Sequence, residues 1–148
     1  MPERYLRSIR LLAQCYQGFE QLSAAHIRQL GLTPSQFDIV ATLGNTSGMS
    51  FKDLGNKTLI TKGTLTGVVD RLEAKGLVRR VTLAEDRRST IVQLTKRGEQ
   101  EFERIFAPHV AHCKQAFADY SERDFDTLEQ ALGMLRQRLD LAVCKLKS

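Results

Sequence analysis

Side chains that can contact phosphate groups and base edges gather in a single stretch of the chain. Lys62, Thr64 and Thr66 lie in a segment of small residues, with Gly63 and Gly67 between and beside them. Lysine neutralises phosphate charge, while threonine hydroxyls can form hydrogen bonds with the edges of bases. This composition indicates a thin, polar helix face suited to the major groove of DNA.

A second group of cations lies in the polar segment 84–88, between two runs of β-branched residues. Arg87 and Arg88 follow Asp86 there. Guanidinium groups at such a tip can enter a minor groove, whose negative potential is strongest along narrow A·T-rich stretches. Asp86 can also pair with one arginine and stiffen the loop while the other arginine points outward.

The positive charge of the chain is concentrated in the same region. Residues 52–98 contain eleven Lys or Arg and five acidic residues, a balance of +6, whereas the rest of the chain balances at −1 and the whole chain at +5. A surplus confined to one block is the electrostatic pattern expected where phosphates are met. A merely solvated basic surface has the same charge, so the order of the predicted elements must distinguish the two.

Two short helices are predicted to position the first group. Ser50 is a suitable N-cap for a helix that buries Phe51 and Leu54. A second helix is predicted over 61–75, where threonine precedes the first turn and glycine follows the last. Its buried positions recur at spacings of three and four: Leu65, Val68, Val69 and Leu72.

After residue 76 the pattern changes from helical to alternating. The runs 77–83 and 89–95 are rich in β-branched residues and predict two strands joined by the arginine-containing segment. A further helix is predicted from about Thr33 to Leu43. Thr33 is a suitable N-cap, and Pro34 suits the first helical position. Helix, turn, helix and β-hairpin in this order predict a winged helix-turn-helix.

Three motifs in this region resemble the signature of the MarR-type transcription regulators. They are Asp70-Arg71-Leu72-Glu73-x-x-Gly76-Leu77-Val78, Asp86-Arg87-Arg88 and Leu94-Thr95-x-x-Gly98. The resemblance covers essentially the whole chain, because the length and the flanking helices also fit. Three positions depart from the usual pattern. Leu59 occupies a turn position often taken by glycine and Thr58 one usually given to leucine, and Gly67 stands where many relatives carry a polar side chain.

The resemblance implies a mainly α fold with a small β-wing, in which N- and C-terminal dimerisation helices flank the winged helix-turn-helix. Residues 1–148 are then a single domain, with the winged helix-turn-helix at about 34–98 and the dimerisation helices at about 1–30 and 99–148. The same resemblance gives Asp86 and Arg88 the wing positions, with Arg88 in the minor groove. Together, residues and resemblance predict DNA contacts from Thr61, Lys62, Gly63, Thr64, Thr66, Arg71, Asp86, Arg87 and Arg88.

Apolar residues recur at steps of three and four in the helices outside the basic region. One such row, from Phe102 to Tyr120, predicts a helix that Pro108 kinks. Burial within one chain accounts for any single row, but a small wing domain offers too little surface to cover them all. We therefore expect the terminal helices to pack across a two-fold axis, as the resemblance also implies, so that a dimer reads a pseudo-palindromic operator. The predicted dimerisation residues are Tyr5, Ile9, Leu12, Leu128, Leu132, Leu135 and Leu139.

Composition narrows the class of protein. The chain has 148 residues, of which 42% are hydrophobic and 26% charged, as is ordinary for one globular domain. No apolar run approaches the roughly 20 residues of a membrane span and the N-terminus lacks a signal-peptide core, so we expect a cytoplasmic protein. Because there is no Gly-rich phosphate loop and no Ser/His/Asp arrangement, we expect neither an enzyme nor a cofactor.

The resemblance further implies a small anionic or phenolic effector that releases a repressor from DNA. The candidate pocket lies between the dimerisation helices and the wing domain. Tyr16, His26 and Phe37 would line it, because they combine aromatic walls with a group able to meet a carboxylate. Ordinary packing in an apolar row explains the same three residues.

Cysteines and histidines leave other interpretations open. Cys15, Cys113 and Cys144 lie on or beside apolar rows, where a thiol acts as a small hydrophobe. A thiol-based oxidant sensor of the same fold is the sharper alternative. His109-x-x-His112-Cys113 resembles part of a zinc site, yet no fourth ligand is evident, so no metal is predicted. A winged helix used only for protein interaction is a third alternative, although its docking face would be apolar or acidic instead of basic.

Overall fold

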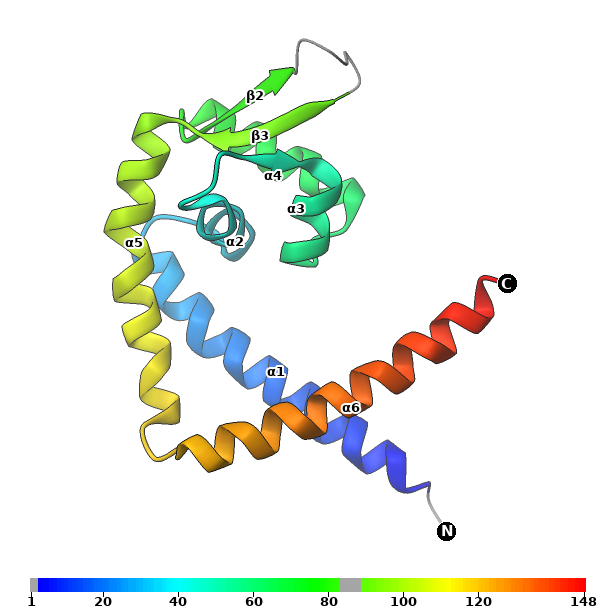
Figure 1. The fold of residues 1–148 in the computed structure, drawn as a ribbon. Helices are drawn as coiled ribbons and strands as arrows, with labels where there is room; N and C mark the ends of the chain where they lie inside the picture. The colour runs from blue at the N-terminus through cyan, green and yellow to red at the C-terminus, as the bar shows by residue number, and fades with distance from the viewer. Residues whose placement is uncertain (1–2, 83–88) are drawn as a thin grey trace. The chain divides into compact units, whose positions relative to one another are not determined.

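The computed structural model describes residues 3–82 and 89–148. It divides into two compact units, Met1–Cys113 and Lys114–Ser148. The first unit carries α1 (Arg4–Gln29), α2 (Pro34–Leu43), β1 (Met49–Ser50), α3 (Phe51–Thr58), α4 (Lys62–Ala74), β2 (Val78–Thr82), β3 (Thr90–Leu94) and nearly all of α5 (Lys96–Lys114) (Figure 1). The second unit carries the 3-10 helix η1 (Gln115–Phe117) and α6 (Glu122–Leu146).

Hydrogen bonds at the helix N-termini explain where α2 and α3 begin. Thr33 Oγ1 accepts from the backbone N–H of Gln36 at 3.2 Å, and the Gln36 side chain accepts from the backbone N–H of Thr33 at 3.2 Å. Ser50 Oγ accepts from the backbone N–H of Asp53 at 3.1 Å. These bonds satisfy backbone donors that a helix leaves without partners in its first turn. The caps predicted at Thr33 and Ser50 are confirmed.

The three strands form one antiparallel sheet in the order β1-β3-β2. Val78 pairs with Leu94 and Thr82 with Thr90, which confirms the predicted hairpin. Strand β1 was not predicted, because a two-residue strand is too short to show alternation. It pairs Met49 with Val92 and joins the entrance of α3 to the sheet.

The core lies between α2, α3 and α4 and the sheet. Figure 1 shows these helices together beneath β2 and β3. Leu65, Val69 and Leu72 of α4 are at most 2% exposed, as are Leu54 of α3 and Val92 of β3. The buried face predicted for the second helix of the motif is therefore confirmed, and α4 has only its opposite face available for binding.

Helix α5 differs from its prediction at both ends. It begins at Lys96 and ends at Lys114, so the expected helix through Tyr120 is wrong at its C-terminal end. Beyond it, the aromatic rings of Phe117, Tyr120 and Phe125 pack against one another, with centroids 5.0–5.8 Å apart. That cluster accounts for the apolar positions Phe117 and Tyr120, whose spacing predicts a continuing helix.

The expected mainly α fold with a small β-wing is confirmed. Within residues 3–82 and 89–148, no helix has the length and hydrophobicity needed to cross a membrane.

Candidate nucleic-acid interface

The turn between α3 and α4 is held by Thr58. Its Oγ1 donates to the carbonyl of Leu54 at 2.7 Å and accepts from the backbone N–H of Ile60 at 3.3 Å. Within this turn Leu59 adopts a left-handed conformation, with φ +61°. The residue is 81% exposed, so it does not gain from burial in the core. Leucine at the usual glycine position costs conformational energy but leaves the turn formed.

The outer face of α4 carries the predicted donors. Lys62, Thr64, Thr66 and Arg71 are all exposed and flank the side of the helix that lies opposite its buried residues. Thr61, the N-cap residue, makes no side-chain capping bond, and its Oγ1 donates to Thr64 Oγ1 at 3.1 Å instead. The structure thus brings the predicted α4 residues together on one accessible surface.

Two glycines keep this surface thin. A Cβ atom at Gly63 or Gly67 would meet no atom of the protein within 4 Å. Packing inside the chain therefore does not require glycine at either position. Their absence of side chains leaves open space in which another molecule can approach the helix backbone closely.

The acidic residues of α4 are neutralised from the wing. Arg80 of β2 forms an ion pair with the carboxylate of Asp70, and its Nη1 lies 3.4 Å from Glu73 Oε1. The same guanidinium lies over the ring of Phe51, 5.6 Å from its centroid. Arg80 thus ties the wing strand to α4 and α3, and it offsets the two negative charges beside the basic face.

This role of Arg80 was not predicted from the sequence. The available signal was the pair of acids, Asp70 and Glu73, three residues apart on a helix whose exposed face is otherwise basic. Neighbouring Arg79 is also engaged, since its Nε donates to Gln93 Oε1 at 2.5 Å. By contrast, four other cations of α3 and α4 have no ion pair among the described residues: Lys52, Lys57, Lys62 and Arg71.

The Leu94-Thr95-x-x-Gly98 motif fixes the exit of α4 to the start of α5. Thr95 Oγ1 donates to the carbonyl of Gly76 at 2.6 Å and accepts from the backbone N–H of Gly98 at 3.0 Å. A Cβ at Gly98 would come within 1.9 Å of the carbonyl oxygen of Leu77, so only glycine fits there. The motif therefore has a structural function near the wing.

The predicted wing-tip residues Asp86, Arg87 and Arg88 lie outside the described residues. The strands that flank them are paired up to Thr82 and Thr90.

The three candidate effector residues are arranged differently from one another. His26 Nδ1 lies 2.9 Å from His109 Nδ1, and the ring of Phe37 lies 4.4 Å from that of His109. His26 and Phe37 therefore both contact His109. Tyr16 is exposed and forms a hydrogen bond with Glu20, not with His109. That hydrogen bond raises the pKa of the Tyr16 phenol.

His109 is buried in this polar cluster between α1 and α5. Its Nε2 lies 3.0 Å from Ser23 Oγ and 3.5 Å from Cys113 Sγ. Burial lowers the pKa of His109, and the neighbouring His26 and His112 lower it further. Burial also raises the pKa of the Cys113 thiol, against the opposing effect of a hydrogen bond with Ser23. In the described part of the chain, no three His, Cys, Asp or Glu side chains are grouped so that they could hold a metal ion.

Known proteins are similar to this chain in sequence and in fold. A family model for the MarR family matches residues 32–90. The HTH-type transcriptional regulator MhqR of Bacillus subtilis is 30% identical over 132 residues, which cover 89% of this chain and 91% of MhqR. The chain belongs to the MarR family. It is therefore a DNA-binding transcriptional regulator.

Two other proteins add detail to this MarR-family assignment. The homoprotocatechuate degradative operon repressor of Escherichia coli is 35% identical over 117 residues, 75% of this chain and 79% of the repressor. A solved structure of Bordetella bronchiseptica BpsR, described as regulated in its DNA binding by 6-hydroxynicotinic acid, has a TM-score of 0.76 and 25% identity. The alignment with BpsR covers 88% of this chain and 98% of that one.

Proposed function

We propose that this MarR-family regulator is a homodimeric repressor whose two α4 helices read the halves of a pseudo-palindromic operator. The outer face of α4 is the observation that carries the proposal. It presents exposed cations and hydroxyl groups, and Gly63 and Gly67 leave open space along it. A major groove admits a helix of this kind.

Each predicted contact residue has a distinct role in this proposal. Lys62 neutralises a phosphate at the start of α4, while Thr64 and Thr66 form hydrogen bonds with base edges. Arg71 lies further along the same face and Thr61 at its entrance. The wing residues Asp86, Arg87 and Arg88 complete the predicted interface, with Arg88 in the minor groove.

A second copy of the chain is the proposed partner of α1 and α6. The apolar row on α1 is exposed, with Tyr5 at 62%, Ile9 at 39% and Leu12 at 37%, and the row on α6 contains Leu132 at 40% and Leu139 at 48%. Covering such rows by symmetric packing removes apolar surface from water. The resulting dimer would place two α4 helices about one DNA turn, ~34 Å, apart.

The proposal is tested by selecting bound sequences from a random DNA pool. The wild-type chain should enrich a pseudo-palindrome, and Thr64→Val or Thr66→Val should relax the preference at one position of each half-site, because valine keeps the shape but loses the hydroxyl. Thr127→Val on α6 is the matched control, since the Thr127 hydroxyl donates to the carbonyl of Arg123 within its own helix. A wild-type chain that enriches no sequence, or threonine variants that enrich an unchanged one, would contradict the assignment of this face.

The proposed signal is a small anionic aromatic molecule, as the effector named for BpsR suggests. Tyr16, His26 and Phe37 remain the candidate residues for binding it between the dimerisation helices and the wing domain. The effector lowers operator affinity only as far as it favours a conformation with poorly spaced α4 helices. Release of operator DNA by peroxide in the wild type, but not in Cys15→Ser, would favour the oxidant-sensing alternative instead.

A further inference from the structure

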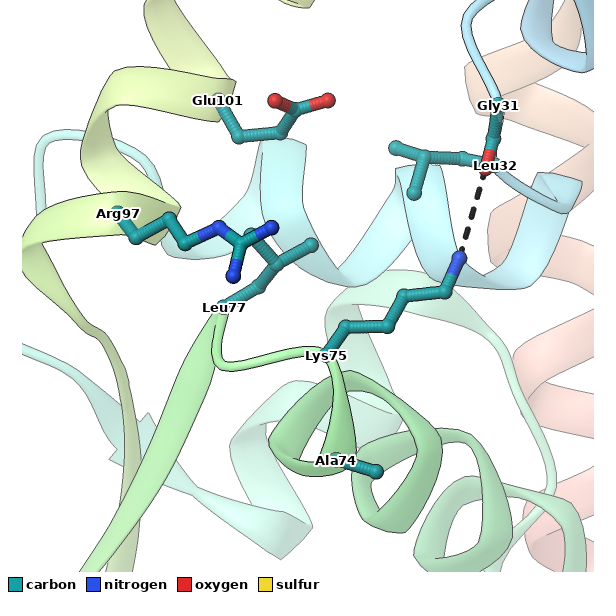
Figure 2. Close-up of a pocket in the computed structure, with 7 residues that line it drawn as sticks. All are labelled: Gly31, Leu32, Ala74, Lys75, Leu77, Arg97 and Glu101. Atoms are coloured by element: carbon teal, nitrogen blue, oxygen red, sulfur yellow. Dashed lines mark hydrogen bonds between the residues drawn. The ribbon is translucent and has the colours of Figure 1, made fainter.

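The two ends of α4 are held in different ways. At the C-terminal end, Lys75 Nζ donates to the carbonyl of Gly31 at 3.4 Å (Figure 2) and to Gln36 Oε1 at 3.2 Å. At the N-terminal end, α4 follows the turn that begins at Leu59. Leu59 is the most exposed of the large hydrophobic residues described in the first unit. The N-terminal end of α4 therefore presents an apolar side chain to its surroundings.

The backbone conformation of Leu59 is unfavourable for leucine. Its φ of +61° and ψ of 13° lie in the left-handed region, where Cβ comes close to the following carbonyl oxygen. The other non-glycine residue described with a positive φ is Asn45, of a type that tolerates this region. Hydrogen bonds of Thr58 and of the Leu59 backbone form the turn, so the leucine side chain is not needed for it. An exposed apolar side chain in such a conformation indicates a role outside the chain.

The sequence around Leu59 is complementary to a polyanion. No acidic residue occurs from Leu54 to Val69. Lys57 precedes Leu59 in the last turn of α3, and Lys62 follows it in the first turn of α4. Both lysines are exposed, and neither has an ion pair among the described residues. An apolar protein surface covering Leu59 would remove water from these ammonium groups without supplying a counter-charge. A DNA duplex has phosphates on both sides of each groove, so it satisfies the lysines and still offers a surface to the leucine.

The major groove exposes one apolar group, the C5 methyl of thymine. A leucine side chain that covers this methyl removes apolar surface of both groups from water. In helix-turn-helix proteins the N-terminal residues of the reading helix contact base edges. The turn that contains Leu59 leads directly into that end of α4. Thymine is therefore the base whose chemistry suits Leu59.

We propose that Leu59 is a specificity-determining residue that packs on the methyl group of one thymine in each half of the operator. This contact rests on the proposed function, because it requires α4 to lie in a major groove. It adds an apolar contact to the polar contacts of α4. Ile60, the next residue, packs against the core. The two neighbouring apolar side chains thus have different roles: Ile60 anchors the turn, and Leu59 reads the DNA.

The test replaces each thymine of the selected operator in turn by deoxyuridine, which keeps the base pair and lacks only the C5 methyl. The wild-type chain should lose affinity about fourfold at one thymine of each half-site, the effect of leaving one methyl-sized apolar group exposed. Leu59→Asn removes the apolar side chain, and asparagine tolerates the left-handed conformation. In this variant deoxyuridine at the same position should have no effect, while any other sensitive thymine keeps its effect. Fluorescence anisotropy measures the affinities.

Two further variants show whether the effect belongs to the leucine contact. Leu59→Met keeps an apolar side chain of similar size, so it should retain the sensitivity to deoxyuridine. Leu141→Asn removes an exposed leucine of α6 and should keep the wild-type pattern. The melting temperature of Leu59→Asn should not fall, because Leu59 is not buried in the core. A lower DNA affinity of that variant is then not a loss of fold.

Several results would overturn the contact. They are equal deoxyuridine effects in the wild type and in Leu59→Asn at every position, and a selected half-site that contains no thymine. A smaller sedimenting species for Leu59→Asn than for the wild type would also overturn it, by placing Leu59 between copies of the chain.

Failure of the proposed function is recognised separately. If the wild type selects no sequence, that function has failed, and duplexes of alternating dA·dT and dA·dU then decide the contact. A wild-type preference for the thymine duplex that Leu59→Asn loses would support the contact. Equal binding of the two duplexes, or binding of neither, would overturn it.

Discussion

The winged region and the terminal helices of this chain bury their apolar residues to very different extents. In α3 and α4, Leu54, Leu65 and Leu72 are at most 2% exposed, whereas Tyr5 of α1 is 62% exposed and Leu139 of α6 is 48% exposed. One region therefore completes its core within a single chain, and the other presents apolar rows with the spacing of helix-packing surfaces. The difference indicates that the winged region folds around its own core, whereas the exposed rows of α1 and α6 are available to pack against another surface.

The two regions also differ in where their ion pairs form. In the winged region Arg80 joins Asp70 and Glu73, and Thr95 and Gly98 fix the adjoining turn. In α6 the ion pair between Arg136 and Asp140 joins two well exposed side chains at 3.8 Å, a geometry that contributes little to stability. Ion pairs between distant residues thus define the surface of the winged region, whereas the ion pair described in α6 lies within a single helix.

The largest effect should come from breaking the assembly surface. Leu139→Glu should dissociate the dimer, because a carboxylate at a buried apolar contact is costly. Loss of the second half-site should then lower operator affinity about 100-fold or more. Sedimentation and fluorescence anisotropy measure the two effects. Leu141→Glu changes an exposed leucine on another face of α6 and should alter neither. A wild-type chain that sediments as a folded monomer at micromolar concentration would contradict the proposed dimer.

A smaller effect is expected from uncoupling the wing from α4. Arg80→Gln leaves Asp70 and Glu73 without their counter-charge beside the proposed DNA-facing surface, so operator affinity should fall about tenfold. Stability should change by no more than about 1 kcal/mol, because the pair is partly exposed to solvent. Fluorescence anisotropy with the operator measures the change in affinity.

Two further variants control this experiment. Adding Asp70→Asn to Arg80→Gln should recover part of the affinity by removing one of the two free charges. Arg79→Gln removes an equal charge whose described hydrogen bond is to the uncharged Gln93, and it should have the smaller effect. If Arg79→Gln and Arg80→Gln weaken binding equally, Arg80 acts only through its net charge.

Gly67→Ala should separate stability from recognition. Alanine favours a helix interior over glycine by about 1 kcal/mol, and a Cβ at position 67 has free space in the protein, so the free energy of unfolding should rise. DNA affinity should nevertheless fall several-fold, because the added methyl group occupies space that the proposed groove contact uses. Gly133→Ala in α6, where a Cβ also has free space, should stabilise without this loss. A more stable Gly67→Ala variant with unchanged DNA affinity would show that DNA does not approach α4 at this point.

The smallest effect concerns pH. The folded protein holds the pKa of His109 below its ordinary value of 6.5, mainly by burial. The unfolded chain therefore binds a proton more readily, and this contribution to stability is complete above pH 6.5 and is lost as pH falls toward the folded pKa. The melting temperature should decrease between pH 7.5 and 5.5, and His109→Gln should flatten that decrease. An identical pH dependence in both proteins would contradict the role given to burial of His109.

Local signals allowed much of the fold to be predicted from the sequence. Helix caps at Thr33 and Ser50, the buried row of α4 and the β2–β3 hairpin all depend on residues close together in the chain. The interactions that were missed join distant segments. Strand β1 consists of two residues whose pairing depends on β3, and Arg80 reaches back to Asp70 and Glu73 through the tertiary fold.

The candidate site divides in the same way. The helical spacing of the apolar residues of α4 was enough to predict the polar face opposite them, because a single helix fixes the directions of its side chains. The contacts of His26 and Phe37 with His109 depend on packing between α1, α2 and α5, which spacing within one helix cannot specify.

The salt dependence of operator affinity, measured for the wild type and for Lys62→Ala, tests the central claim most directly. If the outer face of α4 meets DNA, the logarithm of the association constant should fall linearly with the logarithm of salt concentration, and Lys62→Ala should reduce that slope by about 0.9. Lys145→Ala, an equal loss of charge in α6, should leave the slope unchanged. A Lys62→Ala variant that is folded by circular dichroism and retains both the wild-type slope and the wild-type affinity would contradict DNA recognition by α4.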